Sequence, residues 1–306
     1  MKDLINRIES LLWYKLSINN DDELFTVFAM SNTKSFNKFL IEKDFYLTVL
    51  LSFFAKHLPE IHFKWWTCLN KVYFPYFRLS EDLDFSVSIE EEFVNSRIKR
   101  KQFAYHMREK MQYIATTMWR TLNAEHTQHR KAQGNIFLKH KHYTYLKYVL
   151  SYTSIYDQSE QTIKVELTYT HKQYLPTNNY HFAALFVDPV LDEALFPWET
   201  IECLALEEMM AEKARAALTR KESAIRDFFD IRYVQKSGFD FLEIQELISA
   251  KITETEGKYT IDWQYNELKK QLENDLLPVL GDDIVWFNLQ EIYDFMLTLK
   301  PHILKP

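Results

Sequence analysis

The sequence predicts a mixed α+β fold, in which a sheet with flanking helices occupies residues 1–203 and a helical C-terminal domain occupies residues 204–306. Three observations support this prediction. Residues 83–89 and 163–169 alternate apolar and polar side chains, as half-buried strands do. Residues 1–58 and 91–127 repeat apolar side chains at helical spacing. Beyond residue 204 the chain is rich in strong helix formers.

The N-terminal part contains its elements in a regular order. Residues 1–58 are expected to be helical, because apolar residues such as Leu4, Ile8 and Leu11 fall on one helical face. Shorter, aromatic segments follow over residues 61–89 and end in the first alternating run. Helical spacing returns over residues 91–127, and residues 135–175 contain β-like runs. We therefore expect a mixed sheet with helices in this part of the chain, with a boundary near residue 200.

The composition excludes several classes of protein. The chain of 306 residues has only 4 glycines. They are Gly134, Gly238, Gly257 and Gly281. These positions cannot form a glycine-rich dinucleotide loop or a P-loop, since both need glycines at fixed spacing. The 2 cysteines, Cys68 and Cys203, are expected to be buried small residues in a reducing compartment. We see no signal peptide and no membrane span, and expect a cytoplasmic protein.

Positive charge is concentrated in one segment. Residues 97–147 contain twelve Lys or Arg and only two acidic residues, a net charge of +10, whereas the whole chain has a net charge of −6. Histidines and tyrosines are interleaved with these basic residues. This pattern is typical of a surface that binds a phosphate backbone and stacks on bases. We expect RNA to bind this segment; a solvated helix face and hairpin is the alternative.

Three carboxylates predict a metal site. Asp82 and Asp84 are two residues apart on a predicted strand, so both side chains point to the same face. Glu166 lies in the second alternating run and can supply a third carboxylate from a neighbouring strand. Such a trio can hold one or two Mg²⁺ ions, which use hard oxygen ligands and assist in-line phosphoryl displacement. A solvated strand edge is the alternative interpretation.

Five short motifs occur in order between residues 40 and 231. They are Glu42-Lys43-Asp44, Lys64-Trp65-Trp66-Thr67-Cys68-Leu69-Asn70-Lys71, Arg78-Leu79-Ser80-Glu81-Asp82-Leu83-Asp84, Ala211-Glu212-Lys213 and Arg226-Asp227-Phe228-Phe229-Asp230. In these motifs and their order the chain resembles the AbiEii-type nucleotidyltransferase toxins, which are related to the MenT-type toxins and belong to the DNA polymerase β-like nucleotidyltransferase superfamily. No motif covers the last 70 residues.

The resemblance implies a nucleotidyltransferase-like sheet and an enzyme of a toxin–antitoxin or phage-defence (abortive infection) system. The enzyme would bind an NTP with Mg²⁺ or Mn²⁺ and transfer a nucleotide to an RNA 3′ end such as that of tRNA. A cognate antitoxin protein is an expected partner. These implications leave open which NTP and which RNA the protein uses.

The resemblance also implies a role for each matching residue. Asp82 and Asp84 would be metal ligands, with Glu166 as the third carboxylate. Lys213 would contact nucleotide phosphate and Asp227 would complete the catalytic set. The expected nucleotide-binding residues are Thr67, Lys71, Arg78, Ser80 and Asp230, with Arg78 positioning the turn at Ser80.

Several of these residues have a simpler interpretation. Asp230 could be only the partner of Arg226 in an i,i+4 ion pair. Lys213 could be a solvated helix lysine, and Thr67 could be a β-branched residue of a strand. Lys164, two residues before Glu166 in the sequence, is expected to be exposed or paired in a salt bridge rather than catalytic.

Trp65 and Trp66 are the main departure from the family pattern. The family has Gly-Gly here, which lets two backbone N–H groups approach a triphosphate where a Cβ would obstruct them. The two indoles could reshape the phosphate loop, occupy part of the pocket or stack on a base. Alternatively, they could pack in the core.

Three functions therefore compete. The first is metal-dependent nucleotidyl transfer to RNA. The second is a protein of the same fold with weakened catalysis, which acts by binding RNA or a partner. The third is a different phosphoryl transfer, such as transfer of a γ-phosphate or adenylylation of a protein, which the mass of the product would identify.

Overall fold

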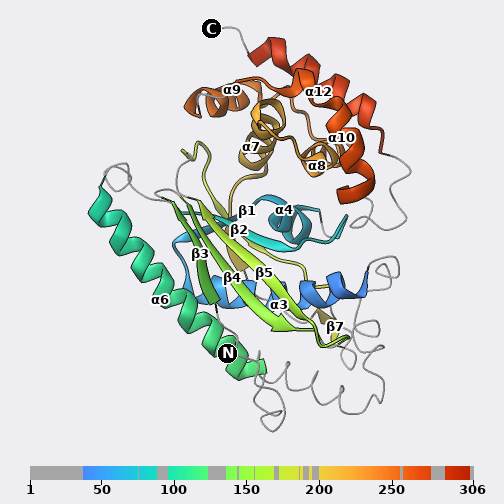
Figure 1. Cartoon of the computed structure of the whole chain (residues 1–306). Coiled ribbons are helices and arrows are strands. Elements are labelled where there is room, and N and C mark those ends of the chain that lie inside the picture. Colours follow the sequence, from blue (N-terminus) through green and yellow to red (C-terminus); the bar gives the residue numbers. More distant parts are fainter. Residues whose placement is uncertain are drawn as a thin grey trace. The chain divides into compact units, whose positions relative to one another are not determined.

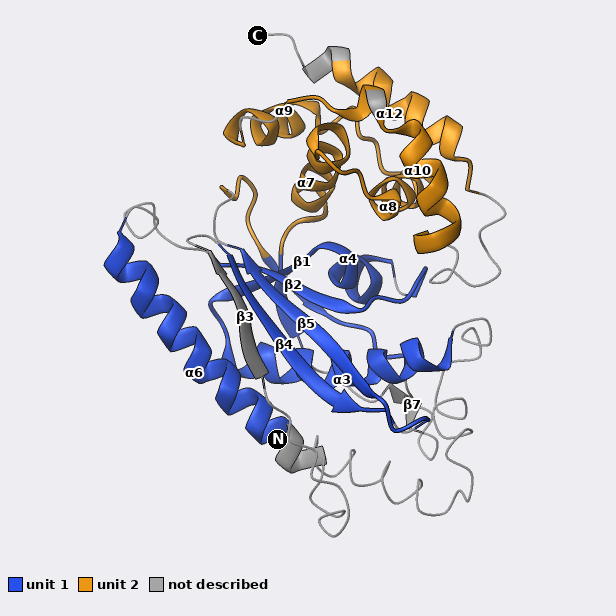
Figure 2. Cartoon of the chain, in the orientation of Figure 1, with its two compact units in different colours: residues 1–170, 178–203 blue, residues 171–177, 204–306 orange. Residues whose placement is uncertain are grey.

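The computed structural model confirms the predicted mixed α+β fold and divides the chain into two compact units (Figures 1 and 2). Unit 1 comprises residues 1–170 and 178–203, and unit 2 comprises residues 171–177 and 204–306. The structure describes residues 37–74, 76–87, 96–122, 136–142, 145–154, 156–168, 172–185, 187–188, 193–194, 200–255, 258–276 and 287–303. The helix expected in residues 1–36 lies outside the described residues.

Unit 1 is built on a seven-stranded mixed sheet with the strand order β3-β4-β5-β2-β1-β9-β6. Its strands are β1 (Ile61–Lys64), β2 (Asp82–Val87), β3 (Ile136–His142), β4 (Tyr145–Thr153), β5 (Glu160–Thr168), β6 (Asn178–His181) and β9 (Thr200–Cys203). Strands β2 and β5 run parallel, whereas β1 and β4 are antiparallel to these neighbours. Strands β7 (Val187–Asp188) and β8 (Glu193–Ala194) form a separate pair. The described parts of the two alternating runs, residues 83–87 and 163–168, thus lie in β2 and β5, whereas residues 88–89 and 169 lie outside the described residues.

Two long helices accompany the sheet in unit 1 (Figure 1). Helix α3 (Lys38–His57) packs Phe54 edge-on against Phe85 of β2, with their ring centroids 5.4 Å apart. Helix α6 (Arg97–Leu122) contacts α3 and buries Met107, Met111 and Ile114, which recur at helical spacing. Both helices confirm the periodicity seen in the sequence.

The sheet has one apolar and one polar face, because side chains alternate along each strand. On β2 and β5 the apolar face buries Leu83, Phe85 and Leu167 completely. The intervening residues of these strands are charged or hydroxyl-bearing, and most of them are partly exposed. This polar face carries the carboxylates predicted to act in catalysis.

The segment that connects β1 to β2, residues 65–81, contains helix α4 (Trp65–Cys68) and the π-helical turn η2 (Leu69–Tyr73). Residues of the Glu42-Lys43-Asp44 motif fasten α3 to its surroundings. Glu42 accepts a hydrogen bond of 2.7 Å from Ser154 Oγ, and Lys43 donates one of 3.1 Å to Glu81. The motif therefore fixes α3 against the segments that lead into and out of the sheet.

Unit 2 is helical, as predicted for the C-terminal part. It contains α7 (Leu206–Thr219), α8 (Ile225–Lys236), α9 (Gln245–Glu254), η3 (Ile261–Trp263), α10 (Tyr265–Gln271), η4 (Leu272–Leu276) and α12 (Leu289–Ile303). Met209, Phe228, Ile248 and Met296 form part of its buried core. None of the helices in the described part of the chain is long and apolar enough to cross a membrane.

Candidate active site

The polar face of the sheet brings the three predicted carboxylates onto two adjacent strands. Asp84 of β2 is the register partner of Glu166 of β5, and Asp82 is the register partner of Lys164. Because these residues share one side of the pleat, their side chains occupy the same face. Asp84 is buried, whereas Asp82 and Glu166 are partly exposed. The structure therefore places Glu166 beside Asp84; its role as a metal ligand stays a prediction.

Lysines accompany these carboxylates. Lys164 Nζ lies 3.4 Å from Asp82 Oδ2, so Lys164 is a salt-bridge partner, as expected. Lys147 of β4 lies 2.6 Å from Glu166 Oε1. At the other end of the same row, Lys64 of β1 is the register partner of Asp84. The row across four strands thus reads lysine, aspartate, glutamate, lysine.

The carboxylates affect one another's protonation. Burial raises the pKa of Asp82, Lys164 partly opposes this, and the nearby charges of Glu81 and Glu166 raise it further. Burial also raises the pKa of Tyr145, whose hydroxyl bonds Glu166. A carboxylate that is harder to ionise beside other carboxylates is a group that a bound cation would stabilise.

The donor chemistry of this face fits a divalent cation such as Mg²⁺, which prefers carboxylate oxygens. Within the described segments, however, no three His, Cys, Asp or Glu side chains are grouped closely enough to hold a metal ion as they stand. Glu166 and Asp82 are turned toward lysines instead. Each lysine contact engages one oxygen of its carboxylate, Oε1 of Glu166 and Oδ2 of Asp82.

The turn before β2 is fastened by the residues predicted to bind phosphate. Thr67 Oγ1 lies 2.9 Å from Ser80 Oγ and also bonds the main-chain oxygen of Asp82. Arg78 Nη1 donates a hydrogen bond of 3.0 Å to Leu79 O, next to Ser80. Thr67 belongs to α4, so the interpretation of Thr67 as a strand residue is wrong. Both hydroxyls are buried and engaged, and their contact with phosphate stays a prediction.

Trp65 adopts a left-handed backbone conformation, with φ of +60°. Glycine is the residue that tolerates this conformation most easily, so a tryptophan here is strained. The two indoles are intermediate in burial, so neither is fully enclosed in the core. Arg78 lies over the Trp66 ring, 3.9 Å from its centroid, and Lys64 lies 4.4 Å from that of Trp65. One face of each ring therefore meets a cation from the chain itself.

Lys71 of η2 is fully buried in the segment between β1 and β2. Its Nζ lies 2.8 Å from Asp44 Oδ1 and donates a hydrogen bond of 2.8 Å to Thr48 Oγ1. Burial lowers the pKa of Lys71, and Asp44 opposes that effect. In this conformation Lys71 is held by α3, so its predicted role toward the nucleotide would require it to leave a buried ion pair.

Unit 2 brings together the three charged residues predicted there. Lys213 Nζ of α7 lies 3.0 Å from Asp230 Oδ2 and 3.6 Å from Asp227 Oδ1, both on α8. Asp230 therefore has Lys213 as a partner, in addition to any contact with Arg226. Lys213 is 3% exposed, so the interpretation of Lys213 as a solvated lysine is wrong. Arg220 extends the cluster with a 2.8 Å bond from Nη1 to Asp227 Oδ2.

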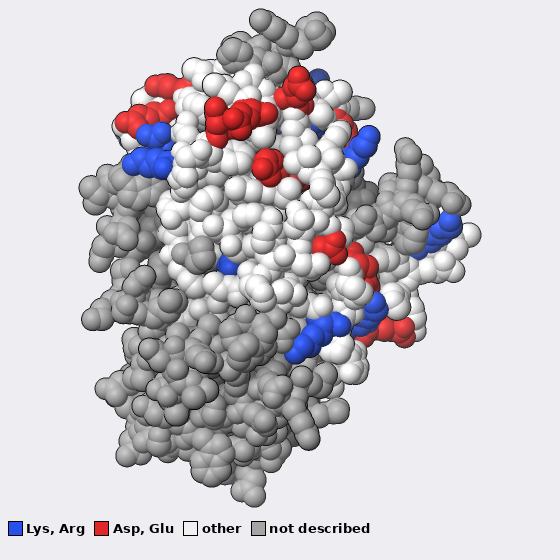
Figure 3. All heavy atoms as spheres, turned by 180° about the vertical axis from the view of Figure 1, so that it is seen from behind, with Lys and Arg blue, Asp and Glu red and all other residues white. Residues whose placement is uncertain are grey.

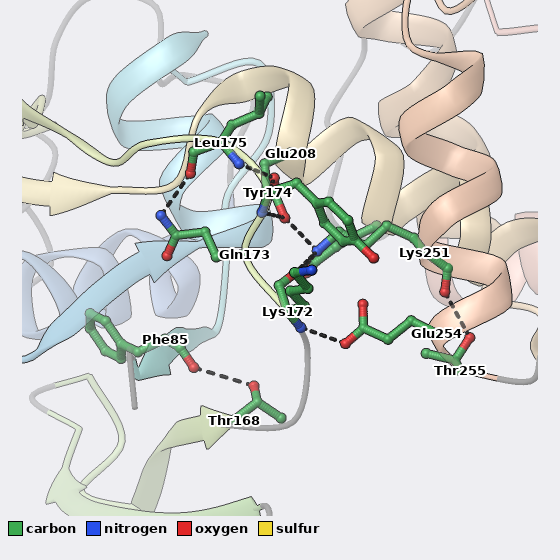
Figure 4. Close-up of polar contacts among 11 residues, drawn as sticks. Phe85, Thr168, Lys172, Gln173, Tyr174, Leu175, Glu208, Lys251, Glu254 and Thr255 are labelled. Atoms are coloured by element: carbon green, nitrogen blue, oxygen red, sulfur yellow. Dashed lines mark hydrogen bonds and ion pairs between the residues drawn. The ribbon is translucent and has the colours of Figure 1, made fainter. Parts of the chain in front are cut away.

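A second buried charge cluster in unit 2 was not predicted from the sequence (Figure 4). Lys251 of α9 forms an ion pair with Glu208 of α7 and donates a hydrogen bond of 2.7 Å to Lys172 O. Glu208 also accepts hydrogen bonds of 3.1 and 3.0 Å from the main-chain N–H groups of Tyr174 and Leu175. This cluster attaches residues 172–175 to the helices of unit 2.

Lys147, Arg220 and Lys251 are the charged residues that sequence reasoning missed. Weak signals existed for two of them. Lys147 is a polar residue within an otherwise apolar strand run, and Arg220 directly follows the helix that carries Lys213. Nothing in the sequence signals Lys251, because its carboxylate partners, Glu208 and Glu212, are 43 and 39 positions away on another helix.

Comparisons with known proteins add the following findings. The family model described as "Nucleotidyl transferase AbiEii toxin, Type IV TA system" matches residues 59–297. A search of curated protein sequences returns no match. The crystal structure of JHP933 from Helicobacter pylori aligns with a TM-score of 0.48 and 16% identity, covering 88% of this chain and 93% of that chain. A candidate nucleotidyltransferase from H. pylori aligns with a TM-score of 0.46 and 15% identity, covering 87% and 95%.

Proposed function

The chain belongs to the AbiEii nucleotidyl transferase toxin family of type IV toxin–antitoxin systems, and on that premise we propose that it transfers a nucleotide from an NTP to an RNA 3′ end, with tRNA as the substrate class. The 3′-hydroxyl attacks the α-phosphorus and forms a new P–O bond. The bond between the α-phosphorus and the bridging oxygen breaks, and pyrophosphate leaves. The proton of the hydroxyl passes to a base or to solvent.

The observation that carries this proposal is the placement of Asp84 beside Glu166, with Asp82 on the same face. These carboxylates would hold Mg²⁺ or Mn²⁺, which supplies positive charge to the phosphoryl oxygens when bound. Lys147 and Lys164 take the place of that charge when no metal is bound, because each pairs with one of the carboxylates. Release of these lysines would then accompany binding of the metal and nucleotide.

The exposed side of α6 supports RNA binding. Arg97, Lys101, Tyr105 and Arg108 are exposed and recur at spacings that align them along one stripe of the helix. Tyr105 is 63% exposed. Guanidinium and ammonium groups suit phosphates, and an exposed ring suits an unpaired base. On the face shown in Figure 3, basic side chains are interspersed with acidic ones and uncharged surface.

A toxin of this family also needs control. We propose a cognate antitoxin protein as a partner and the cytoplasm as the place of action, because tRNA and NTPs occur together there. An antitoxin gene adjacent to this one, together with rescue of growth on its co-expression, would support the proposal. Growth arrest that no neighbouring gene relieves would contradict it.

The direct test is transfer of label from α-labelled NTPs to tRNA. The purified full-length chain is incubated with each of the four NTPs, with Mg²⁺, with Mn²⁺ and with a chelator. We expect label on the RNA 3′ end with at least one NTP, and none with the chelator. Folded protein that labels no RNA with any NTP and either metal would contradict the proposal.

Variants assign the reaction to the sheet face. Asp84→Asn and Glu166→Gln should each lower transfer by about 10²-fold or more, as loss of transition-state charge stabilisation does. Glu160→Gln is the matched control, since Glu160 is an exposed carboxylate at the other end of the same strand as Glu166. Equal losses in Glu160→Gln and Glu166→Gln would show that the effect is not specific to the site.

The RNA surface is tested by the dependence of tRNA affinity on salt. Combined replacement of Arg97, Lys101 and Arg108 by Gln should weaken tRNA binding and reduce the slope of log affinity against log salt by about 2–3. Lys269→Gln with Lys270→Gln is the control, because both lysines are exposed on α10. An unchanged slope in the α6 variant would place the RNA elsewhere.

The second candidate is a protein of this family that binds RNA or a partner without turnover. The cations over Trp66 and Trp65 favour it, because they hold both indoles in the turn where the family has glycines. Replacing Trp65 and Trp66 by Gly separates the two candidates. NTP binding that only the double variant shows would support the non-catalytic candidate, whereas equal activity before and after would exclude it.

A further inference from the structure

The exposed cation of the unit 2 charge cluster is Arg220 rather than Lys213. Lys213 is 3% exposed and its ammonium group already faces the carboxylates of Asp230 and Asp227, at 3.0 and 3.6 Å. An ammonium group paired with two carboxylates attracts a further anion only weakly, because the negative charges of the carboxylates oppose the attraction. The Arg220 side chain, by contrast, is 40% exposed while it contacts the same Asp227.

The bond between Arg220 and Asp227 leaves donors for a second anion. Nη1 donates to Asp227 Oδ2 at 2.8 Å. A guanidinium has five N–H donors in a planar fork, so one edge can hold a carboxylate while another holds a phosphate. Asp227 thereby orients the guanidinium and keeps one part of it toward solvent.

The backbone at Arg220 is fixed from three sides. Arg220 N donates to Ala216 O at 2.9 Å, which closes the last turn of α7. Thr260 Oγ1 and Gln264 Nε2 donate to Arg220 O at 2.5 and 2.8 Å. The guanidinium is therefore presented from a fixed main chain, which lowers the conformational entropy lost when it binds a ligand.

The charge of a second arginine, Arg215, interacts with that of Arg220. Burial lowers the pKa of Arg215, and the positive charge of Arg220 lowers it further, so the two arginines repel each other, while Glu212 and Asp227 partly compensate. A polyphosphate next to two arginines would relieve this repulsion.

We propose that Arg220 binds the triphosphate of the nucleotide, whereas Lys213 holds Asp227 and Asp230 in position. Arg220 is then a binding residue and Lys213 a positioning residue. The inference deepens the proposed nucleotidyl transfer and rests on it for the identity of the ligand. It needs no statement about RNA, so it can be tested by binding alone.

The test measures binding of inorganic tripolyphosphate and of each NTP to the full-length chain by isothermal titration calorimetry. Arg220→Gln should weaken tripolyphosphate and NTP binding by about 10- to 100-fold, which corresponds to loss of a charged hydrogen bond. Arg220→Lys keeps the charge without the fork and should fall between Arg220→Gln and the wild type. Arg232→Gln is the matched control, since Arg232 is an arginine of α8 paired with Glu291.

The outcomes separate this inference from the proposed function. Tripolyphosphate binding that depends on Arg220, in a protein that transfers no nucleotide, would support the inference and contradict the transfer reaction. Transfer by the wild type with unchanged tripolyphosphate affinity in Arg220→Gln would overturn the inference alone. Loss of kcat without loss of affinity would also overturn it, because Arg220 would then only support Asp227. A wild-type chain that does not bind tripolyphosphate overturns it as well.

Discussion

The buried pair Lys71–Asp44 offers the clearest test of a residue role that sequence and structure describe differently. The resemblance assigns Lys71 to the nucleotide, whereas the structure buries both side chains completely, with Nζ and Oδ1 2.8 Å apart. At an effective dielectric constant of about 20, that distance corresponds to an attraction of about 6 kcal/mol, much of which offsets desolvation of the two charges. Removal of one partner leaves the other buried alone. We therefore expect Lys71→Met to lower the free energy of unfolding by about 3–5 kcal/mol.

The assay is a double-mutant cycle in urea, followed by fluorescence and circular dichroism. Asp44→Asn should be destabilising as well, and the double variant should be less destabilised than the sum of the single variants by about 2 kcal/mol or more. The exposed pair Lys270–Glu267 is the control, with side chains 74% and 59% exposed and a distance of 3.5 Å. Its coupling should stay below about 0.5 kcal/mol.

One result would refute this reasoning. If Lys71→Met loses less than about 1 kcal/mol of stability but loses NTP affinity, Lys71 leaves the buried pair to meet the nucleotide. The opposite result, a destabilised protein that still binds an NTP when measured at low temperature, would assign Lys71 to the fold alone.

Three further predictions concern single positions. The pKa of Asp82 is raised in the folded chain, so ionisation of this carboxyl lowers the free energy of unfolding as the pH rises from about 3.9. The Asp82→Asn variant should therefore be more stable than the wild type at pH 7 by up to about 1 kcal/mol, and equally stable at pH 3. Equal dependence of stability on pH in the two proteins would contradict this. Trp65→Gly should exceed Trp65→Ala in stability by about 1 kcal/mol, because both remove the indole but only glycine relieves the positive φ; equal urea midpoints would argue against strain there. Glu208→Ala should cost about 3–5 kcal/mol and expose the amides of residues 174–175 to hydrogen exchange, since Lys251 loses a buried partner; protected amides would contradict this.

The sequence alone determined the kind of structure on each side of residue 204. The alternation of apolar and polar residues predicted β2 and β5, because a half-buried strand presents apolar side chains to one face only. Helix α7 was legible as well, since strong helix formers occupy most of its positions. The same alternation put Asp82 and Asp84 on one face and singled out Glu166, which the structure sets beside Asp84; its role as a third metal ligand stays a prediction. The order of the motifs gave the family, which the match over residues 59–297 shows.

Which charges meet was decided only by the tertiary structure. The parallel register of β2 and β5 sets Glu166 beside Asp84, and the next strand sets Lys147 beside Glu166. No local pattern contains this information, because the register depends on how residues far apart in the chain pair after the loops between them close.

The same reason applies to the buried lysines and to Arg220. Lys71 pairs with Asp44, which is 27 positions away in the sequence, and Lys213 of α7 pairs with Asp230 of α8. The sequence around a helix lysine does not show whether the lysine faces solvent or a buried carboxylate. The neighbours that determine its pKa and its contacts come from other elements of the fold. The sequence thus identified the charged residues. The tertiary packing decided which of them form buried ion pairs and which, like Arg220, stay partly exposed to solvent.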